Sequence, residues 1–244
     1  MVKLKYIIQR VMTLKLNLDP AILEILPTFK VGFNHYTKIT VSESPQMLKG
    51  RLQLFQEYLF FDLEEKPATD FPGIKEWREV WKSFGANPIR HRHSTEALMR
   101  RIAKQNYLNP VHSAVDLNSF FSLQYEIPVG IYDADKIKGN ISLSIGNKES
   151  GYDGLNGRFN SLENILVLSD DEGSFGSPYV DSARTAVTEE TTNALHVFFL
   201  RPSMESSKAL ELTTATGKMF TEISGGDVQS FVLHKNQDSI TIEG

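Results

Sequence analysis

Apolar residues at steps of three or four predict amphipathic helices in the first half of the chain. The clearest runs cover 47–63 and 73–84. Ser94 is expected to begin another helix, with Glu96 in the first turn, where the helix dipole favours an acid. That helix is expected to extend to about Gln105.

A further helix is predicted over 113–125, and it is apolar on almost every side. Ser113 and Asp116 have the spacing of a capping box, and Asp116 is the single charged residue between Ser113 and Gln124. A helix of this kind is normally buried. Its small polar residues are therefore expected to lie inside the fold or to line a pocket: Asn118, Ser119 and Ser122.

Strand patterns dominate after Pro128. Alternation or continuous apolar runs predict strands at 141–145, 164–168, 194–200 and 229–233, with a last long helix over 203–223, and alternation at 29–33 and 37–41 predicts an N-terminal strand or hairpin. The fold class is therefore α+β. We expect residues 1–72 to form a strand and helix extension that packs on a core domain of residues 73–244, as one structural unit overall.

About 24 residues with little hydrophobic patterning separate the strands that end near Ser169 and begin at Ala194. A loop longer than roughly 12–15 residues is usually either functional or disordered. Three of its side chains are candidates for a site because they bring a guanidinium and hydroxyl groups: Arg184, Thr185 and Thr188.

The composition is that of a globular protein, with 41% hydrophobic residues in a chain of 244. The absence of cysteine excludes disulfides, thiol catalysis and cysteine-ligated metal sites. The first residues, Met1–Ile8, resemble a signal peptide, but Gln9 and Arg10 interrupt the apolar run, so we interpret them as mature chain. No stretch approaches the roughly 20 apolar residues of a membrane span, and a cytoplasmic protein without a membrane partner is expected.

Basic residues gather in one segment of a chain whose net charge is −4. Between Lys75 and Lys104 lie eight basic residues and three acids. Four arginines of this segment are candidates for contacts to RNA phosphates: Arg90, Arg92, Arg100 and Arg101. A solvated helix face with ordinary intrahelical pairs accounts for the same charges equally well.

The densest titratable cluster is Arg90-His91-Arg92-His93, and its two histidines are candidates for acid–base chemistry or phosphate recognition, although an exposed loop is the simpler interpretation. No third ligand with a suitable spacing is present, so we expect no metal. Asp133 and Asp135 resemble the start of a calcium loop, but lysines follow in the wrong places. Serine-nucleophile motifs are absent as well, and no cofactor is expected.

Three segments resemble the B3/B4 domain of the bacterial phenylalanyl-tRNA synthetase β subunit: Val115–Leu123, Ile127–Gly139 and Val187–Leu195. The family pattern reads approximately VDxTNxxxLExGxPLHAFDxDKIxG, then a glycine-rich turn, then VxxETxNxLL. The resemblance covers roughly Gly73 to Gly226. It implies helices packed on a mostly antiparallel β core, and a domain that hydrolyses the ester of a wrongly charged tRNA.

The family's motif residues are only partly present here. The resemblance places the Thr-Asn pair of the synthetase on Asn118 and Ser119, its pocket histidine on Gly130, and a pocket glutamate near Ala183. Substrate binding is therefore expected at Asn118, Ser119, Ser122, Gly130 and Thr188. Catalysis is expected to involve His91, His93, Arg184 and Thr185, with the tRNA acceptor end held by Arg90, Arg92, Arg100 and Arg101.

The hypothesis from the sequence is a trans-editing aminoacyl-tRNA deacylase. A non-catalytic module that binds tRNA or an amino acid is the alternative, and another small-molecule reaction on the same fold is a third. The oligomeric state is not fixed by the sequence.

Overall fold

Two antiparallel-rich sheets form the β core of the computed structural model, which describes residues 13–243. The segment Met1–Ile8, interpreted above as mature chain, lies outside the described residues. The five-stranded sheet has the order β11-β1-β4-β7-β8 and the four-stranded sheet the order β10-β2-β9-β3. The strands of the first sheet are β11 (Ser239–Glu243), β1 (Thr13–Leu18), β4 (Ile141–Ile145), β7 (Leu166–Asp170) and β8 (Gly173–Gly176). Only the β1–β4 pair is parallel.

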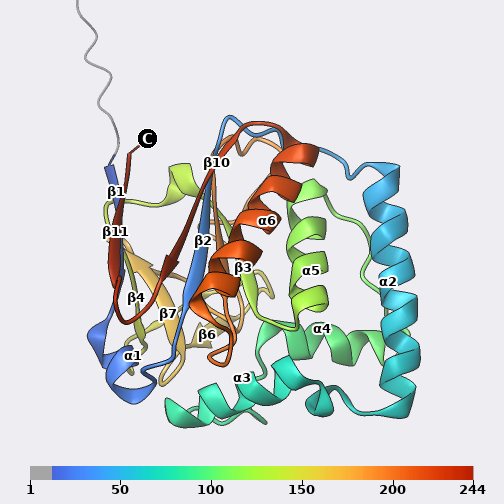
Figure 1. Cartoon of the computed structure of the whole chain (residues 1–244), viewed down its shortest axis with the longest axis horizontal. Coiled ribbons are helices and arrows are strands. Elements are labelled where there is room, and N and C mark those ends of the chain that lie inside the picture. The colour runs from blue at the N-terminus through green and yellow to red at the C-terminus, as the bar shows by residue number, and fades with distance from the viewer. Residues whose placement is uncertain (1–12, 244) are drawn as a thin grey trace, which may run out of the picture.

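The four-stranded sheet lies between the helices and the other sheet (Figure 1). Its strands are β10 (Asp227–Leu233), β2 (Val31–Thr37), β9 (Ala194–Phe199) and β3 (Val129–Asp133). Every residue of β9 is buried, as expected of a strand covered on both faces. The short strands β5 (Gly151–Asp153) and β6 (Phe159–Ser161) form a separate hairpin.

Helices α5 (Ser113–Tyr125) and α6 (Ser206–Ser224) cover one face of this four-stranded sheet (Figure 1). Outside α5 lie α2 (Gln46–Glu65) and α4 (Ser94–Ile102). Helix α3 (Pro72–Ser83) lies at one end, where Trp77 contacts Phe199 of β9 at 6.1 Å between ring centroids. The short helix α1 (Pro20–Ile25) follows β1, and 3-10 turns cover Ala68–Asp70 and Ala134–Lys136.

Most of the helices predicted from the hydrophobic pattern are confirmed, with shifted ends. Helix α5 covers the whole predicted range, whereas α4 ends at Ile102 rather than near Gln105. The predicted capping box of α5 is wrong: the cap is His112, whose Nδ1 accepts from the backbone N–H of Val115 at 3.3 Å. Asp116 instead accepts from the backbone of Val111 and from Ser44, and so ties the start of α5 to the loop before α2.

The strand predictions were less complete. Strands β1, β3, β5, β6, β8 and β11 were not predicted, and β8 occupies part of the segment interpreted as one long loop. The described part of the predicted N-terminal extension supplies an interior strand to each main sheet, β1 and β2. The class itself, helices on a mostly antiparallel core, is as predicted.

Candidate functional site at the α5–β3 edge

A network of buried polar side chains, with the partly exposed Asn118 at its end, lies between the four-stranded sheet and its helices. Asn34 and Tyr36 project from β2, His196 from β9 and Asn118 from α5. The Tyr36 hydroxyl lies 3.3 Å from His196 Nδ1, and His196 Nε2 lies 3.2 Å from Asn118 Oδ1. Asn34 Nδ2 donates to the Tyr36 hydroxyl at 3.3 Å and to the carbonyl of Thr213 in α6 at 2.9 Å. These bonds tie three secondary-structure elements to Asn118.

The hydrogen bonds of this network have one consistent direction. Asn118 Nδ2 donates to the carbonyl of Val129 at 3.3 Å, which leaves Oδ1 as the acceptor for His196 Nε2–H. Nδ1 of His196 then accepts from the Tyr36 hydroxyl. Burial lowers the pKa of His196 to about 3, so the ring is neutral at physiological pH, and burial raises the pKa of Tyr36 above its usual range. The neutral network therefore fixes the orientation of the Asn118 carboxamide.

An oriented donor is left over at Asn118. A carboxamide carries two N–H groups, and among the described residues only the Val129 carbonyl accepts from this one. Asn118 is partly exposed, as is Ser119 beside it, whose hydroxyl has no hydrogen-bond partner in the described part of the chain. Asn118 thus presents one N–H at the edge of the sheet beside Val129, where β3 is the last strand, and Ser119, the next residue of α5, carries a hydroxyl without a partner within residues 13–243.

Ser122, one helical turn further along α5, is buried and engaged. Its hydroxyl lies 2.9 Å from that of Thr95 in α4 and donates to the carbonyl of Ile127 at 2.9 Å. These bonds join the first turn of α4 to α5 and close the turn after α5. Both bonds already engage the Ser122 hydroxyl within the protein. Its predicted contact with a substrate stays a prediction.

Gly130 lies on the opposite face of the sheet from the Asn118 network. Residues paired across strands share a face, so Ile131 lies with His196 towards the helices, and Gly130 lies with Val197 towards the other sheet. A Cβ on Gly130 would collide with the hydroxyl of Tyr132, whose ring is fully buried against Phe175 of β8 at 5.2 Å between centroids. The space where a side chain at position 130 would begin is thus filled by Tyr132.

Replacing Gly130 with alanine is expected to destabilise the protein by about 1–3 kcal/mol, because overpacking in a closed core is unfavourable. The measurement is the free energy of unfolding in urea. Tyr132→Phe removes the atom nearest to the added methyl group. Gly130→Ala should therefore cost less free energy of unfolding in the Tyr132→Phe background than in the wild type. A full loss in both backgrounds would show that the hydroxyl is not the obstacle.

The Tyr132 hydroxyl donates to Asp181 Oδ1 at 2.6 Å. Burial raises the pKa of Asp181 to about 7, although hydrogen bonds from Tyr132 and from the backbone at Ser177 act in the opposite direction. Between pH 3.8, the ordinary pKa of the carboxyl, and about pH 7, Asp181 of the folded protein keeps a proton that the unfolded chain has released. Stability from this group therefore falls as the pH rises through this window.

Asp181→Asn is expected to remove this dependence on pH, since an amide does not ionise and its oxygen still accepts from Tyr132. The melting temperature of the variant relative to the wild type should be higher at pH 8 than at pH 5. Asp153→Asn, at an exposed position, is the control. An equal difference at both pH values would contradict the raised pKa.

The loop after β8 packs on the outer end of β3. The carbonyl of Thr185 accepts from the backbone of Asp133 at 2.9 Å, and the buried Thr185 hydroxyl has no partner among the described residues. Arg184 binds Asp170 through both nitrogens, at 2.8 and 3.0 Å, and also pairs with Glu172 at 3.2 Å. Thr188 is exposed, and its hydroxyl accepts from the backbone of Glu190.

Two separate sets of predicted residues thus meet the same edge strand. Asn118 contacts Val129, and Thr185 contacts Asp133. These two residues of β3 lie about 13 Å apart along the strand, at 3.2–3.4 Å per residue. The roles predicted for Arg184, Thr185 and Thr188 stay predictions.

The predicted histidines differ in accessibility. His93 is fully buried as the cap of α4, with Nδ1 facing the backbone N–H of Glu96, and burial together with Arg78 lowers its pKa to about 3. His91 is half-buried against Tyr179, with 5.5 Å between ring centroids, and burial and Arg90 lower its pKa. Their catalytic roles stay predictions, and only His91 has part of its surface open to solvent.

The basic segment divides into paired and unpaired groups. Arg78 and Arg100 bind the buried carboxylate of Glu96 at 3.0 and 2.9 Å. Arg90, Arg92 and Arg101 are exposed and form no ion pair with any residue from 13 to 243. These three arginines lie on α4 and on the connector before it, and α4 packs against α5.

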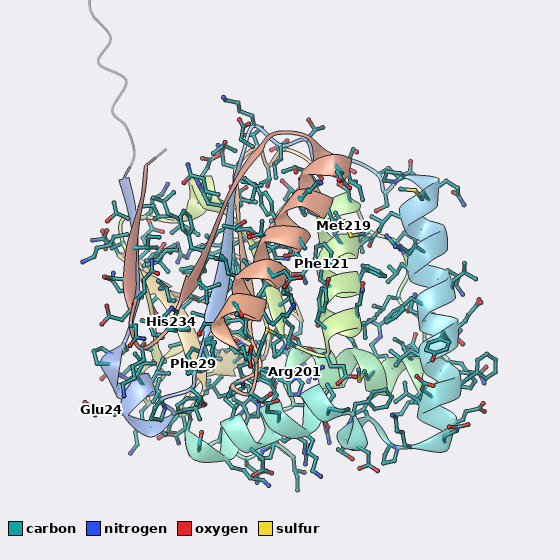
Figure 2. All side chains as sticks on the ribbon, in the orientation of Figure 1. Glu24, Phe29, Phe121, Arg201, Met219 and His234 are labelled. Carbon is teal, nitrogen blue, oxygen red and sulfur yellow. The ribbon has the colours of Figure 1, made fainter. Side chains whose placement is uncertain are left out.

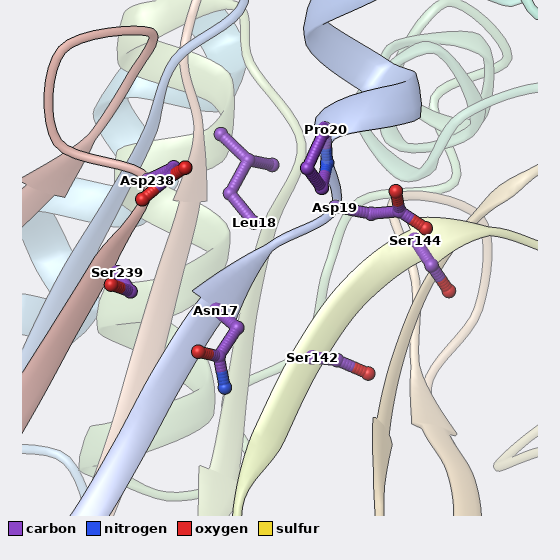
Figure 3. A pocket seen from close by; sticks show the side chains of 8 residues that line it. All are labelled: Asn17, Leu18, Asp19, Pro20, Ser142, Ser144, Asp238 and Ser239. Atoms are coloured by element: carbon purple, nitrogen blue, oxygen red, sulfur yellow. The ribbon is translucent and has the colours of Figure 1, made fainter.

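Two cavities have walls that do not include Asn118. One of about 330 Å³ lies between β1 and β4, with walls that include Asp19, Ser142 and Asp238 (Figure 3). A second, of about 190 Å³, lies beside Arg90 and His91. Within residues 13–243, no group of three or more histidine or acidic side chains is placed to hold a metal ion, and no helix is long and apolar enough to cross a membrane.

Sequence reasoning missed the residues behind Asn118. Asn34, Tyr36 and His196 lie in strands whose sequences are mostly apolar. A polar residue inside such a strand needs a hydrogen-bond partner, and that requirement was the signal in the sequence. Tyr132 and Asp181 were missed because they are 49 residues apart in the chain and meet only in the folded protein. Figure 2 shows Phe121, which packs on His196 at 5.9 Å between ring centroids, on the helix side of the sheet.

Comparison with known proteins shows that this α+β chain is similar to part of a synthetase subunit. The family described as "B3/4 domain" matches residues 76–223. The chain therefore belongs to the B3/4 domain family, as the resemblance predicted.

The relatives differ in length. The chain is 36% identical over 215 residues to the protein named "Uncharacterized protein YhzB" of Bacillus subtilis, covering 87% of this chain and 96% of that protein. It is 29% identical over 126 residues to the phenylalanine–tRNA ligase β subunit of Fusobacterium nucleatum, covering 50% of this chain and only 16% of the subunit. A solved N-terminal fragment of the β subunit from Pyrococcus horikoshii aligns with a TM-score of 0.48 and 16% identity, over 95% of this chain and 55% of that fragment.

Proposed function

We propose that the chain is a trans-editing deacylase that binds the aminoacylated 3′ end of a mischarged tRNA and hydrolyses the ester. The observation that carries this proposal is the oriented, unused N–H of Asn118. A fixed donor is what an ester carbonyl needs as negative charge develops on its oxygen, and it needs no reorganisation during the reaction. Ser119 adds a second polar contact from the same turn of α5.

Water attack at this site does not require an ionised side chain. Aminoacyl esters are already reactive, and holding the carbonyl against a donor beside water supplies much of the acceleration. The free vicinal hydroxyl of the terminal ribose is available to pass the proton. The protein's part in the hydrolysis is thus to bind the ester and to polarise its carbonyl.

The positive surface beside α5 supports a polynucleotide ligand. Arg90, Arg92 and Arg101 are unpaired within the described residues, whereas Arg100 is engaged by Glu96. Guanidinium groups bind phosphate oxygens without reading sequence. Three such contacts imply modest affinity that falls as the salt concentration rises.

The test is deacylation of a panel of mischarged and correctly charged tRNAs by micromolar protein. We expect one or more mischarged tRNAs to be deacylated faster than in buffer, and we expect tRNAs that carry their correct amino acid to be spared. If no ester in the panel is cleaved above the buffer rate, the enzyme proposal is wrong.

The second candidate is a module that binds the aminoacyl end without turnover. The observation that favours it is the chemistry around Asn118: among residues 13–243, His196 is the one ionisable side chain bonded to it, and that ring is neutral with both nitrogens engaged. Salt-sensitive binding of charged tRNA without hydrolysis would select this candidate. Arg92→Glu should weaken that binding, and Arg158→Glu, on the separate hairpin, should not.

A further inference from the structure

Helix α2 carries a row of exposed apolar side chains on a face that no other part of residues 13–243 covers. Met47, Leu54, Tyr58 and Phe61 are 73%, 69%, 64% and 64% exposed. A different row on the same helix, made mostly of leucines, packs on the core. Figure 1 shows α2 at the border of the molecule, with one side free along its whole length. Grouped exposed apolar residues of this size mark an interaction surface.

The exposed row has the repeat of a coiled-coil seam. Met47, Leu54 and Phe61 are seven residues apart, and Arg51 and Tyr58 fall between them at alternating steps of four and three. A spacing of 3.5 residues keeps such a row facing a second, slightly supercoiled helix. The geometry therefore fits a helical partner better than a flat one.

The charges of α2 are arranged against its own dipole. The half 46–54 carries Lys49 and Arg51 and no acid, and the half 55–65 carries four acids and no base. No acid lies in the first turn and no base in the last. This order disfavours an isolated helix. Lys49 pairs with Glu43, which leaves Arg51 as the base of the first half without an acidic partner among residues 13–243. A second copy that runs in the opposite direction brings this base towards the four acids, whereas a parallel copy brings the acids together.

We propose that α2 is the contact surface of a homodimer in which two copies of the helix pack antiparallel about a two-fold axis near Leu54. Such an interface uses the same patch on both chains. Met47 then lies against the partner's Phe61. Arg51, whose guanidinium lies 5.4 Å from the centroid of the Phe120 ring in its own chain, lies beside the acidic half of the partner helix. A parallel pair would bring Arg51 against its own copy.

The available surface suits a dimer of moderate affinity. An aromatic side chain buries about 150–250 Å² in full, so four residues exposed by about two thirds bring on the order of 800 Å² from both chains. Flanking polar side chains raise the total towards the roughly 1,200 Å² where specific interfaces begin. We therefore expect dissociation in the micromolar range.

Sedimentation equilibrium of the full chain across micromolar concentrations tests the dimer. The wild type should associate, and Leu54→Glu should weaken association by at least about tenfold. Leu155→Glu, which is similarly exposed on the β5–β6 hairpin, should change nothing. A wild type that stays monomeric throughout, or a dimer unaffected by Leu54→Glu, would overturn the proposal.

Cross-linking tests the orientation, because the chain has no cysteine of its own. Met47→Cys and Phe61→Cys chains, mixed under mild oxidation, should form a disulfide-linked heterodimer. Neither chain alone should link efficiently. Efficient self-linking of Met47→Cys would indicate a parallel pair and would contradict the antiparallel arrangement.

Discussion

Asn118→Ala is expected to lower the rate of aminoacyl-ester hydrolysis by about 100-fold, with a small effect on tRNA affinity. Removing one donor that is fixed towards a developing oxyanion typically costs about two to three orders of magnitude in rate. The ground-state contribution is small because most of the tRNA contact is to phosphates. The measurement is single-turnover deacylation at saturating protein, together with filter binding of the same charged tRNA.

Two controls separate this effect from a loss of structure. Asn160→Ala removes the side chain of a buried asparagine in the β5–β6 hairpin and should leave hydrolysis unchanged. Asn118→Ala also removes the acceptor of His196 Nε2–H, so its unfolding free energy must be measured in parallel. Hydrolysis at the wild-type rate in a folded Asn118→Ala protein would exclude the site at this edge.

Glu96→Gln is expected to lower the free energy of unfolding by about 2–3 kcal/mol. The carboxylate is fully buried and binds both Arg78 and Arg100, so its removal leaves two guanidinium groups without their counter-charge. Breaking a fully buried pair costs about 3–5 kcal/mol, and the partial exposure of both arginines reduces that figure. Urea denaturation at low salt gives the value, and the melting temperature should fall by roughly 4–12 °C.

Glu79→Gln is the matched control, because it removes the partner of Lys82 from an exposed pair on the neighbouring helix. It should change the free energy of unfolding by less than about 0.5 kcal/mol. Equal losses in the two variants would show that burial does not set the strength of the Glu96 pairs.

The helices could be predicted from the sequence because their apolar spacing is local. Helix α5 shows this best: its apolar surface predicted burial, and two of its polar exceptions, Asn118 and Ser119, are partly exposed. The motif resemblance predicted the family, which the match over 76–223 confirms. Both signals are contained in short stretches of sequence.

The environment of each candidate group could not be predicted in this way, since it depends on contacts between distant segments. Arg184 has a guanidinium that suits a substrate contact, but Asp170 and Glu172 from the adjacent hairpin bind it. His93 follows Arg92 in a basic connector, yet packing on α3 buries it. The Tyr36–His196–Asn118 chain likewise joins positions that are up to 160 residues apart.

Binding of a hydrolysis-resistant amide analogue of an aminoacyl-adenosine tests most directly whether Asn118 holds the ester. In the free protein, one side-chain N–H of Asn118 donates to the Val129 carbonyl, and the other has no acceptor within residues 13–243. Titration followed by NMR should therefore shift the Asn118 side-chain amide resonances in a saturable way, with the unused proton moving most. Saturable shifts at another surface that leave the Asn118 resonances unchanged would contradict the proposed site.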